Sequence, residues 1–234
     1  MDLIIIPTYN ERENVEDMIH AVFAQGDNFH LLIVDDGSPD GTAQLVKQKM
    51  HTFPDRLHVL ERSGKLGLGT AYIAGFKWAL EKGYTYIFEM DCDFSHNPKD
   101  LNRLLSACKN NHGVAVGSRY VHGGGTIDWP WHRRLISKGG SIYVNLILGL
   151  GVKDSTGGFV CYYHEVLKSL NLDEIQFIGY AFQIEMKYKS KKNGFQITEV
   201  PIQFADRTKG TSKMSLNIFH EAFLGVLKMR FSKK

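Results

Sequence analysis

Five short and almost uninterrupted apolar runs mark the first half of the chain, and they constrain its fold more than any other feature. They occupy residues 3–6, 31–34, 57–60, 84–90 and 114–116. None shows the strict alternation of apolar and polar residues that a half-exposed strand would have. Each run is therefore typical of a strand buried on both faces of a mainly parallel sheet.

Helical patterns separate these runs. Between the first two, apolar residues recur at helical spacing from Val15 to Phe23, and Asn10 followed by Glu13 is typical of a helix cap. Further helices are expected at residues 42–50, 68–81 and 98–109. The alternation of strands and helices predicts an α/β fold with an open, Rossmann-like sheet, in which ligands lie at the carboxyl ends of the strands.

The pattern changes after about residue 118, where a loop bearing Gly and Trp begins. Beyond it we expect helices at 133–150 and 180–191 and strands at 159–163 and 195–204. The chain has 234 residues, a length that one α/β domain routinely reaches. We therefore expect a single domain over residues 1–214, whose second half shares the core of the first, followed by a C-terminal helix at 215–234.

The segment after residue 206 is basic and amphipathic. Residues 207–234 hold seven Lys and Arg against the single acid Glu221, whereas acids slightly outnumber bases in the rest of the chain. Basicity confined to the tail argues against a nucleic-acid-binding domain and for a segment that meets phosphates or a lipid surface. The apolar stripe from Leu216 to Leu227 fits a helix in a lipid interface, and it also fits one packed on the domain.

Cysteine usage and the length of the apolar runs bear on the compartment. No run reaches the roughly 20 residues of a membrane-spanning helix, so the chain is not expected to cross a bilayer. Its three cysteines, Cys92, Cys108 and Cys161, form no CxxC pair. This usage predicts a reduced, cytoplasmic protein.

Acidic side chains follow two of the expected strands directly. The strand at 31–34 runs into Asp35 and Asp36, and the strand at 84–90 runs into Asp91-Cys92-Asp93. Carboxylates at the carboxyl edge of a sheet can hold a hard divalent cation and a sugar or ribose hydroxyl. A single aspartate of this kind is more often a turn or capping residue, but two clusters at one edge indicate a functional site.

A glycine-containing turn, KLGLGTA, lies at residues 65–71. Its position between a strand and a helix would let the backbone approach a nucleotide. It is not a dinucleotide-binding fingerprint, because GxGxxG is incomplete and the turn does not follow the first strand. The ten histidines are scattered without an HxxxH pair, so imidazoles are not expected to chelate a metal.

Several motifs occur together in a fixed order. They are PTYNEREN at 7–14, DDGSPDGT at 35–42, KLGLGTAY at 65–72, DCDFSH at 91–96 and GSRY at 117–120. In this order and spacing they resemble family 2 glycosyltransferases of the GT-A fold. The later segments are RRLIS at 133–137, DSTGGF at 154–159, FQIEM at 182–186 and DRTKGTSK at 206–213. With them, the chain resembles the polyprenol (dolichyl) phosphate mannose synthases from end to end.

This resemblance implies an activity. It is an inverting transfer of mannose from GDP-mannose to polyprenyl (dolichyl) phosphate, dependent on Mg²⁺ or Mn²⁺, by a peripheral protein at the cytoplasmic membrane face. The acceptor phosphate is already anionic, so no catalytic base is required. Two alternatives stay open: a glucosyltransferase that uses a UDP-sugar and the same kind of acceptor, and a catalytically silent membrane scaffold that binds sugar nucleotides.

The resemblance also assigns a nucleotide pocket, a metal site and phosphate-binding cations. The expected nucleotide pocket consists of Pro7, Tyr9, Glu11, Val34, Asp36, Asp91 and Cys92. The expected metal ligands are Asp91 and Asp93. The cations expected at phosphate groups are Arg119, Arg133, Arg207 and Lys213, with Arg133 near the lipid phosphate. Asp93, Arg119 and Arg207 are expected to act in catalysis, by stabilising the charge that develops on the leaving diphosphate.

Five further residues are candidates for a part in the site. Glu185 would either contact the sugar or form a salt bridge, and Asp154 would either face the sugar or cap a turn. Ser95 stands where some family members carry Gln, and we leave it out of the metal set because serine is a poorer metal ligand. Trp129 and Trp131 are candidates for isoprenoid contact, with packing on the second half as their expected role.

Overall fold

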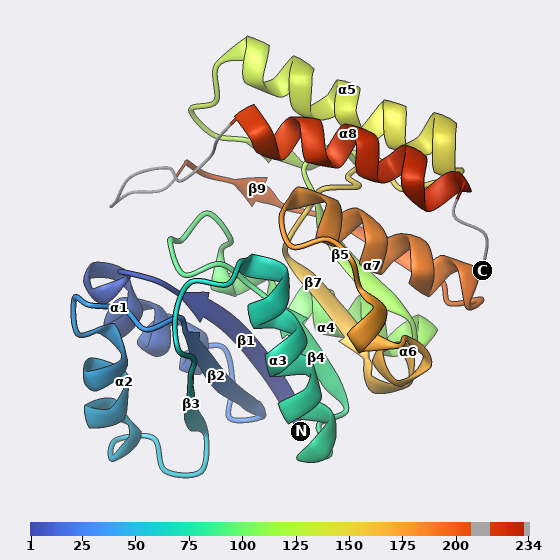
Figure 1. Ribbon diagram of the computed structural model, residues 1–234. Coiled ribbons are helices and arrows are strands. Elements are labelled where there is room, and N and C mark those ends of the chain that lie inside the picture. The colour runs from blue at the N-terminus through green and yellow to red at the C-terminus, as the bar shows by residue number, and fades with distance from the viewer. Residues whose placement is uncertain (207–215, 232–234) are drawn as a thin grey trace.

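Figure 1 shows the computed structural model of the chain, which describes residues 1–206 and 216–231, with backbone alone for Tyr180 and residues 216–222. Its strands are β1 Asp2–Thr8, β2 Phe29–Asp35, β3 Leu57–Glu61, β4 Tyr86–Glu89, β5 Val114–Ser118, β6 Gly125–Thr126, β7 Val160–Tyr163, β8 Ile197–Pro201 and β9 Gln203–Phe204. Its α-helices are α1 Arg12–Phe23, α2 Thr42–Met50, α3 Leu68–Glu81, α4 Leu101–Asn111, α5 Trp131–Leu148, α6 His164–Ser169, α7 Tyr180–Lys192 and α8 Leu216–Phe231. Short 3-10 helices are η1 Pro98–Asp100 and η2 Leu172–Glu174.

In the described part of the chain, seven strands form a central sheet in the order β3-β2-β1-β4-β7-β5-β8. β1 pairs in parallel with β2 and β4, β2 with β3, and β5 with β8, whereas β7 runs antiparallel between β4 and β5. The expected mainly parallel sheet is thus confirmed. The carboxyl ends of β1, β2, β4 and β5 therefore meet along one edge of the sheet.

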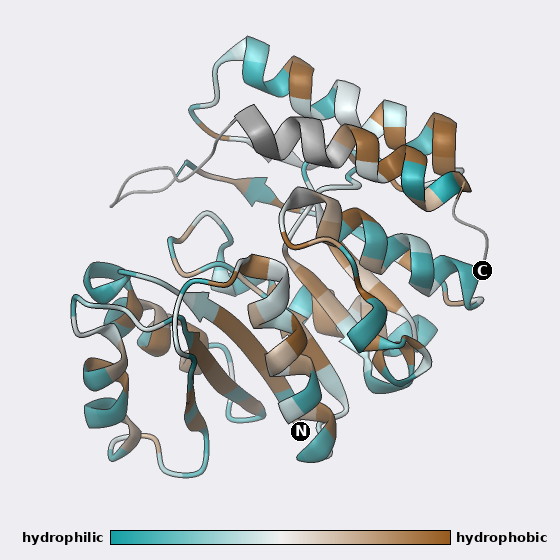
Figure 2. Cartoon of the chain, viewed as in Figure 1, coloured by the Kyte–Doolittle hydropathy of each residue, from teal (hydrophilic) through white to brown (hydrophobic). Residues whose placement is uncertain are grey.

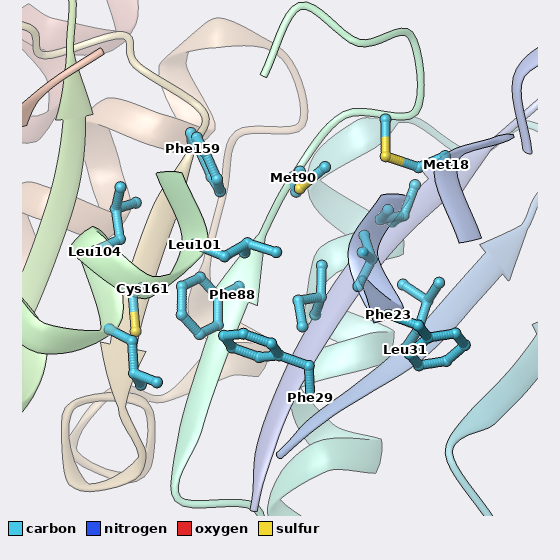
Figure 3. Close-up of a cluster of buried hydrophobic side chains, with 14 of the residues drawn as sticks. Met18, Phe23, Phe29, Leu31, Phe88, Met90, Leu101, Leu104, Phe159 and Cys161 are labelled. Carbon is cyan, nitrogen blue, oxygen red and sulfur yellow. The ribbon is translucent and has the colours of Figure 1, made fainter. Parts of the chain in front are cut away.

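The sheet is buried on both faces because adjacent residues of each strand enter different cores. Ile4 and Ile6 pack in one cluster with side chains of α1, α2 and α4, part of which Figure 3 shows. Leu3 and Ile5 pack in a second cluster with side chains of α3, α6 and α7. Figure 2 shows the consequence in hydropathy, since the central strands are hydrophobic along their length. This two-sided burial is why the runs read as continuously apolar.

A third layer, formed by α5 and α8, lies over α7 (Figure 1). Val144 of α5, Ile184 of α7 and Val226 of α8 are buried together in it. Phe223 and Leu224 of α8, by contrast, are about half exposed. The C-terminal stripe is therefore partly packed on the domain and partly open. The expected boundary between residues 214 and 215 falls outside the described residues.

None of the helices in the described residues is both long enough and apolar enough to pass through a bilayer.

The helix cap expected at Asn10 is wrong. α1 begins at Arg12, and no side chain caps it. Asn10 instead adopts a left-handed φ of 55°, and its backbone N–H donates to the Ser38 hydroxyl at 2.9 Å. The Glu11 carboxylate accepts a hydrogen bond from the Asn14 amide at 2.9 Å. A contact with the turn after β2 therefore determines how this segment enters the helix, and a local sequence pattern does not contain that contact.

Candidate active site

A large cavity opens along the carboxyl edge of the sheet. Its volume is about 1310 Å³, above the range of roughly 300–1,000 Å³ that one small ligand usually occupies. Residues at or just after the ends of β1, β2 and β4 line it, together with side chains of α5, α7 and α8. A cavity of this size can hold two substrates whose reacting groups meet inside it.

The cavity brings together most of the residues that the sequence assigned to the site. Those that line it are Pro7, Tyr9, Glu11, Asp36, Asp91, Cys92, Asp93, Arg119 and Arg133. Val34 is not among them, because it is fully buried in the core with Leu32 and Tyr72. Its part in nucleotide binding stays a prediction. Arg207 and Lys213 lie outside the described residues, so their roles stay predictions too.

An arginine that the sequence analysis missed holds Asp36. Arg62, directly after β3, donates from Nε to one oxygen of Asp36 at 2.7 Å and from Nη2 to the other at 3.0 Å. Its Nη1 donates to the Thr70 hydroxyl at 3.0 Å, and that hydroxyl donates to the Gly67 carbonyl at 2.7 Å. One guanidinium thus fixes both the carboxylate and the glycine turn. Only the parallel pairing of β2 with β3 brings Arg62 beside Asp36.

The glycines of this turn allow it to lie tightly against the start of α7. Gly67 has a φ of 104°, and a Cβ there would lie 3.1 Å from the Ile178 side chain. A Cβ on Gly69 would lie 2.8 Å from the Phe182 ring, closer than such atoms approach. The Gly69 N–H donates to the Ile178 carbonyl at 2.9 Å. The turn therefore needs its glycines for packing as well as for access to the cavity.

A buried histidine fixes the backbone of the carboxylate motif after β4. The backbone N–H of Asp91 donates to His96 Nδ1 at 3.1 Å, so the neutral ring carries its proton on Nε2. Burial lowers the pKa of His96 to about 4, which keeps the ring neutral at pH 7. Asp93 is 8% exposed, and its Oδ1 accepts from the backbone N–H of Ser95 at 3.1 Å. The turn thus holds both aspartates at the wall of the cavity.

These two carboxylates fit a hard divalent cation. Asp91 and Asp93 both line the cavity and offer oxygen ligands, which Mg²⁺ and Mn²⁺ prefer. Burial raises the pKa of the Cys92 thiol well above its usual value, so Cys92 offers no thiolate at neutral pH. Residues 1–206 and 216–231 contain no group of three His, Cys, Asp or Glu that could bind a metal by itself. A cation here would take its remaining ligands from a bound diphosphate and water.

Arg119, after β5, is fixed by Asp154. The buried Asp154 carboxylate accepts from the Arg119 backbone N–H at 2.9 Å, from Nε at 2.7 Å and from Nη2 at 2.6 Å. The same Nη2 donates to the Thr156 hydroxyl at 2.9 Å. Asp154 is therefore the counter-ion that orients Arg119, a role that the sequence analysis did not consider.

Arg133, on α5, shares an aromatic neighbour with Arg119. The guanidinium carbon of Arg133 lies 3.9 Å from the centre of the Trp129 ring, and that of Arg119 lies 5.3 Å from it. Nη1 of Arg133 donates to both oxygens of Asp206, at 2.9 and 3.0 Å. Trp129 is 7% exposed, which confirms its expected packing role, whereas that expectation is wrong for Trp131, which is 75% exposed.

Glu185 does not line the cavity. Its buried carboxylate accepts from the backbone N–H groups of Gln176 and Phe177 at 2.9 and 3.1 Å and lies 2.8 Å from the Lys189 ammonium. These contacts favour the salt-bridge role over the sugar contact. The polar side chain of α7 that does line the cavity is Gln183, which the sequence analysis did not single out.

Part of the cavity lining is apolar. The apolar side chains of α5, α7 and α8 that line it are Ile136, Tyr143, Val144, Ile184, Phe223 and Val226. The rings of Tyr143 and Phe223 stack at 4.7 Å with an angle of 14°, and the Tyr143 hydroxyl donates to the Phe223 carbonyl at 3.1 Å. One cavity thus combines carboxylates, two arginines and apolar side chains, which suits a ligand with an anionic head and an apolar chain.

Comparisons with known proteins identify the class to which this site belongs. The family model of glycosyl transferase family 2 matches residues 3–170. The chain is 46% identical over 224 residues to a polyprenol monophosphomannose synthase of Mycolicibacterium smegmatis, covering 96% of this chain and 84% of the relative. It is 43% identical over 224 residues to an undecaprenyl-phosphate mannosyltransferase of Micrococcus luteus, with 96% and 91% covered. The chain belongs to glycosyl transferase family 2.

Solved structures of low sequence identity share the GT-A fold. Glucosyl-3-phosphoglycerate synthase of Mycobacterium tuberculosis, in complex with UDP, has a TM-score of 0.68 at 16% identity and covers 98% of this chain and 79% of its own. A mannosyltransferase of Pyrobaculum calidifontis, in complex with GDP-mannose and Mn²⁺, has a TM-score of 0.58 at 16% identity and covers 90% and 57%. These likenesses confirm the fold expected from the sequence.

Proposed function

We propose that the chain is a metal-dependent, inverting glycosyltransferase that moves mannose from GDP-mannose to the phosphate of a polyprenyl phosphate. The observation that carries this proposal is the set of groups that line one cavity: carboxylates, Arg119 and Arg133, and apolar side chains. A donor diphosphate, an acceptor phosphate and an isoprenoid chain require these three kinds of group. The two relatives above, whose names state a polyprenol or undecaprenyl phosphate and mannose, support it.

The chemistry follows from the acceptor. An oxygen of the lipid phosphate attacks the anomeric carbon of mannose while the bond from that carbon to the diphosphate oxygen breaks. The electron pair of the broken bond leaves with GDP, and the configuration at the anomeric carbon inverts. The nucleophile is already anionic, so the reaction needs no general base. The buried, neutral His96 therefore has no role as a base in the proposed reaction.

Charged groups held in place by the fold are then expected to stabilise the transition state. Arg119 is expected to stabilise the charge on the leaving diphosphate, and Arg133 is expected to hold the acceptor phosphate. Asp154 holds Arg119 before the substrate arrives, so little reorganisation is needed during the reaction. Asp91 and Asp93 would hold a divalent cation, which when bound supplies Lewis-acid stabilisation of the leaving diphosphate.

We also propose that the outer face of α5 and α8 lies on the cytoplasmic face of a membrane. Exposed apolar side chains gather there, and Figure 2 shows hydrophobic segments on α5 and on the coloured part of α8. They are Trp131, Leu135, Ile142 and Leu146 on α5 and Leu224 and Phe231 on α8. Lys228 and Arg230 add positive charge in the last turn of α8. Apolar side chains of the same helices line the cavity, so an isoprenoid chain could enter without leaving the bilayer.

Liposome binding tests this surface. We expect salt-sensitive binding to vesicles containing anionic lipid, weakened at least about fivefold by Leu146→Asp, because the charge would enter the interface. Leu146 is 78% exposed, so the fold should tolerate the change. Leu66→Asp is the matched control, since Leu66 is 57% exposed on the glycine turn and its replacement should leave binding unchanged. Equal binding by both folded variants would contradict the membrane proposal. The substitution tests membrane binding more specifically than truncation after Gly225 would, because truncation also removes the buried Val226.

A donor panel tests the activity. The purified chain would be incubated with a short polyprenyl phosphate, Mg²⁺ or Mn²⁺, and GDP-mannose or UDP-glucose. We expect a glycosylated lipid product with GDP-mannose and none with UDP-glucose. Transfer from UDP-glucose alone would favour the glucosyltransferase alternative, and nucleotide binding without any transfer would favour the scaffold alternative.

A further inference from the structure

Three polar side chains lie buried beneath the cavity. They are Glu89 at the end of β4 and Gln183 and Lys187, one turn apart on α7, with exposed fractions of 0%, 3% and 0%. Of the three, only Gln183 lines the cavity. Burying polar and charged groups is costly unless they are well paired. Packing alone therefore does not explain why these three polar side chains are buried together.

Glu89 and Lys187 hold the Gln183 amide from its two ends. Nε2 of Gln183 donates to Glu89 Oε2, and Lys187 Nζ donates to Gln183 Oε1 at 3.3 Å. The Lys187 ammonium also donates to the carbonyls of Gly157 at 2.7 Å and Gln183 at 3.2 Å. An ammonium can only donate, so the atom that faces it must be the amide oxygen. Burial lowers the pKa of Lys187 only to about 8, so this charge is largely kept at neutral pH.

This orientation leaves one amide hydrogen to be used. The nitrogen carries two, one of which goes to Glu89. Among the residues whose side chains the structure describes, no acceptor takes the other hydrogen, so a ligand in the cavity could accept it.

The Gln183 nitrogen lies near the carboxylate motif. A Cβ on Gly158 would lie 3.7 Å from Gln183 Nε2 and 3.7 Å from His96 Cε1, and Gly158 lines the cavity. A side chain at Gly158 would thus occupy the space between the amide and the histidine. Since His96 is bonded to the backbone of Asp91, this space adjoins the carboxylate motif.

The neighbouring acids are already engaged. Asp154 is paired with Arg119, and Glu185 accepts from two backbone N–H groups and pairs with Lys189. Neither therefore competes with Gln183 for a ligand in this space.

We propose that Gln183 recognises the donor sugar by donating its second amide hydrogen to a hydroxyl of the sugar ring, with Glu89 and Lys187 as the residues that position it. The proposal rests on the proposed function, in that a sugar nucleotide occupies the cavity. Gln183 would determine sugar specificity. A hydrogen-bond donor held in place by buried partners binds a sugar with the matching hydroxyl better than a sugar without it.

The test is a set of deoxy and epimeric donors. GDP-mannose, its four monodeoxy analogues and GDP-glucose would be compared with the wild type and with Gln183→Met, which keeps the length of the side chain and removes its hydrogen bonds. For one analogue, the wild type should lose about tenfold in kcat/KM. In Gln183→Met the loss for that analogue should disappear, and kcat/KM for GDP-mannose should fall about tenfold. The affinity for GDP, which lacks the sugar, should change less than about twofold.

Lys187→Met separates positioning from packing. It is not a lining residue, so it should weaken the discrimination between GDP-mannose and the critical analogue while leaving GDP affinity unchanged. Gln48→Met, at an exposed position of α2, is the control for replacing a glutamine by methionine. A folded Gln183→Met protein that penalises every analogue as the wild type does would overturn the proposal.

The outcomes also separate this proposal from the proposed function. If the wild type uses UDP-glucose instead, the donor assignment fails, and the same comparison with deoxy analogues of UDP-glucose decides the role of Gln183. If the wild type neither binds nor turns over GDP-mannose or UDP-glucose, both proposals are overturned.

Discussion

Replacement of Asp154 by alanine should destabilise the fold by a large and calculable amount. The carboxylate is fully buried, and its partner Arg119 has a side chain only 8% exposed. The carboxylate accepts three hydrogen bonds from that arginine, at 2.9, 2.7 and 2.6 Å. Removing one partner of a buried ion pair leaves an uncompensated charge and costs about 3–5 kcal/mol. This is a large share of the roughly 5–15 kcal/mol by which a domain is stable.

Urea and thermal unfolding would measure the effect of Asp154→Ala. For a domain of this size each kcal/mol shifts Tm by about 2–4 °C, so we expect a fall of about 6–20 °C. The double variant Arg119→Met/Asp154→Ala should be more stable than Asp154→Ala alone, because the buried cation is gone. Glu165→Ala is the control, since it removes an exposed pair with Lys168 and should leave Tm almost unchanged. A cost below about 1 kcal/mol for Asp154→Ala, or additive effects in the double variant, would refute the reasoning.

Two further predictions concern the metal and acid stability. Transfer should stop in excess chelator and return with Mg²⁺ or Mn²⁺, and full activity in chelator would exclude a role for the metal. Asp93→Ala should lower kcat at least about a hundredfold while its circular dichroism spectrum stays unchanged. Burial lowers the pKa of His58 below its usual 6.5 in the folded protein. The unfolded chain therefore binds more protons in the window below pH 6.5, and stability should fall with decreasing pH there. His58→Gln should make this fall shallower in urea titrations from pH 7 to 5, and an unchanged slope would contradict the assignment.

The fold was predictable because its signal is local and repeated. The strand of Leu3 to Ile6 sends alternate side chains into two cores, and a continuous apolar run is the direct trace of that burial. The helix cap at Asn10 failed for the opposite reason. A hydrogen bond to Ser38, 28 residues away, sets the local backbone, and the capping pattern does not include it.

The site was predictable to the extent that motifs carry it. Asp91, Asp93 and Arg119 sit at strand ends within recognisable segments, and the cavity brings them together. The partners that orient such residues come from distant segments with no motif of their own. Arg62 reaches Asp36 through the pairing of β2 with β3, and Gln183 reaches Glu89 across 94 positions of sequence. Sequence patterns therefore indicate the residues proposed to contact substrates more readily than they indicate the residues that orient those side chains.

The most direct test of the proposed activity counts both products of one reaction. The protein would be mixed with GDP-mannose and a polyprenyl phosphate in vesicles, and released GDP and lipid-linked mannose would be measured in the same sample. We predict equal amounts of the two, with a mannosyl phosphate whose anomeric configuration, read by NMR, is inverted relative to the donor. Release of GDP with free mannose and no lipid product, or a product that retains the configuration of the donor, would contradict the proposed reaction.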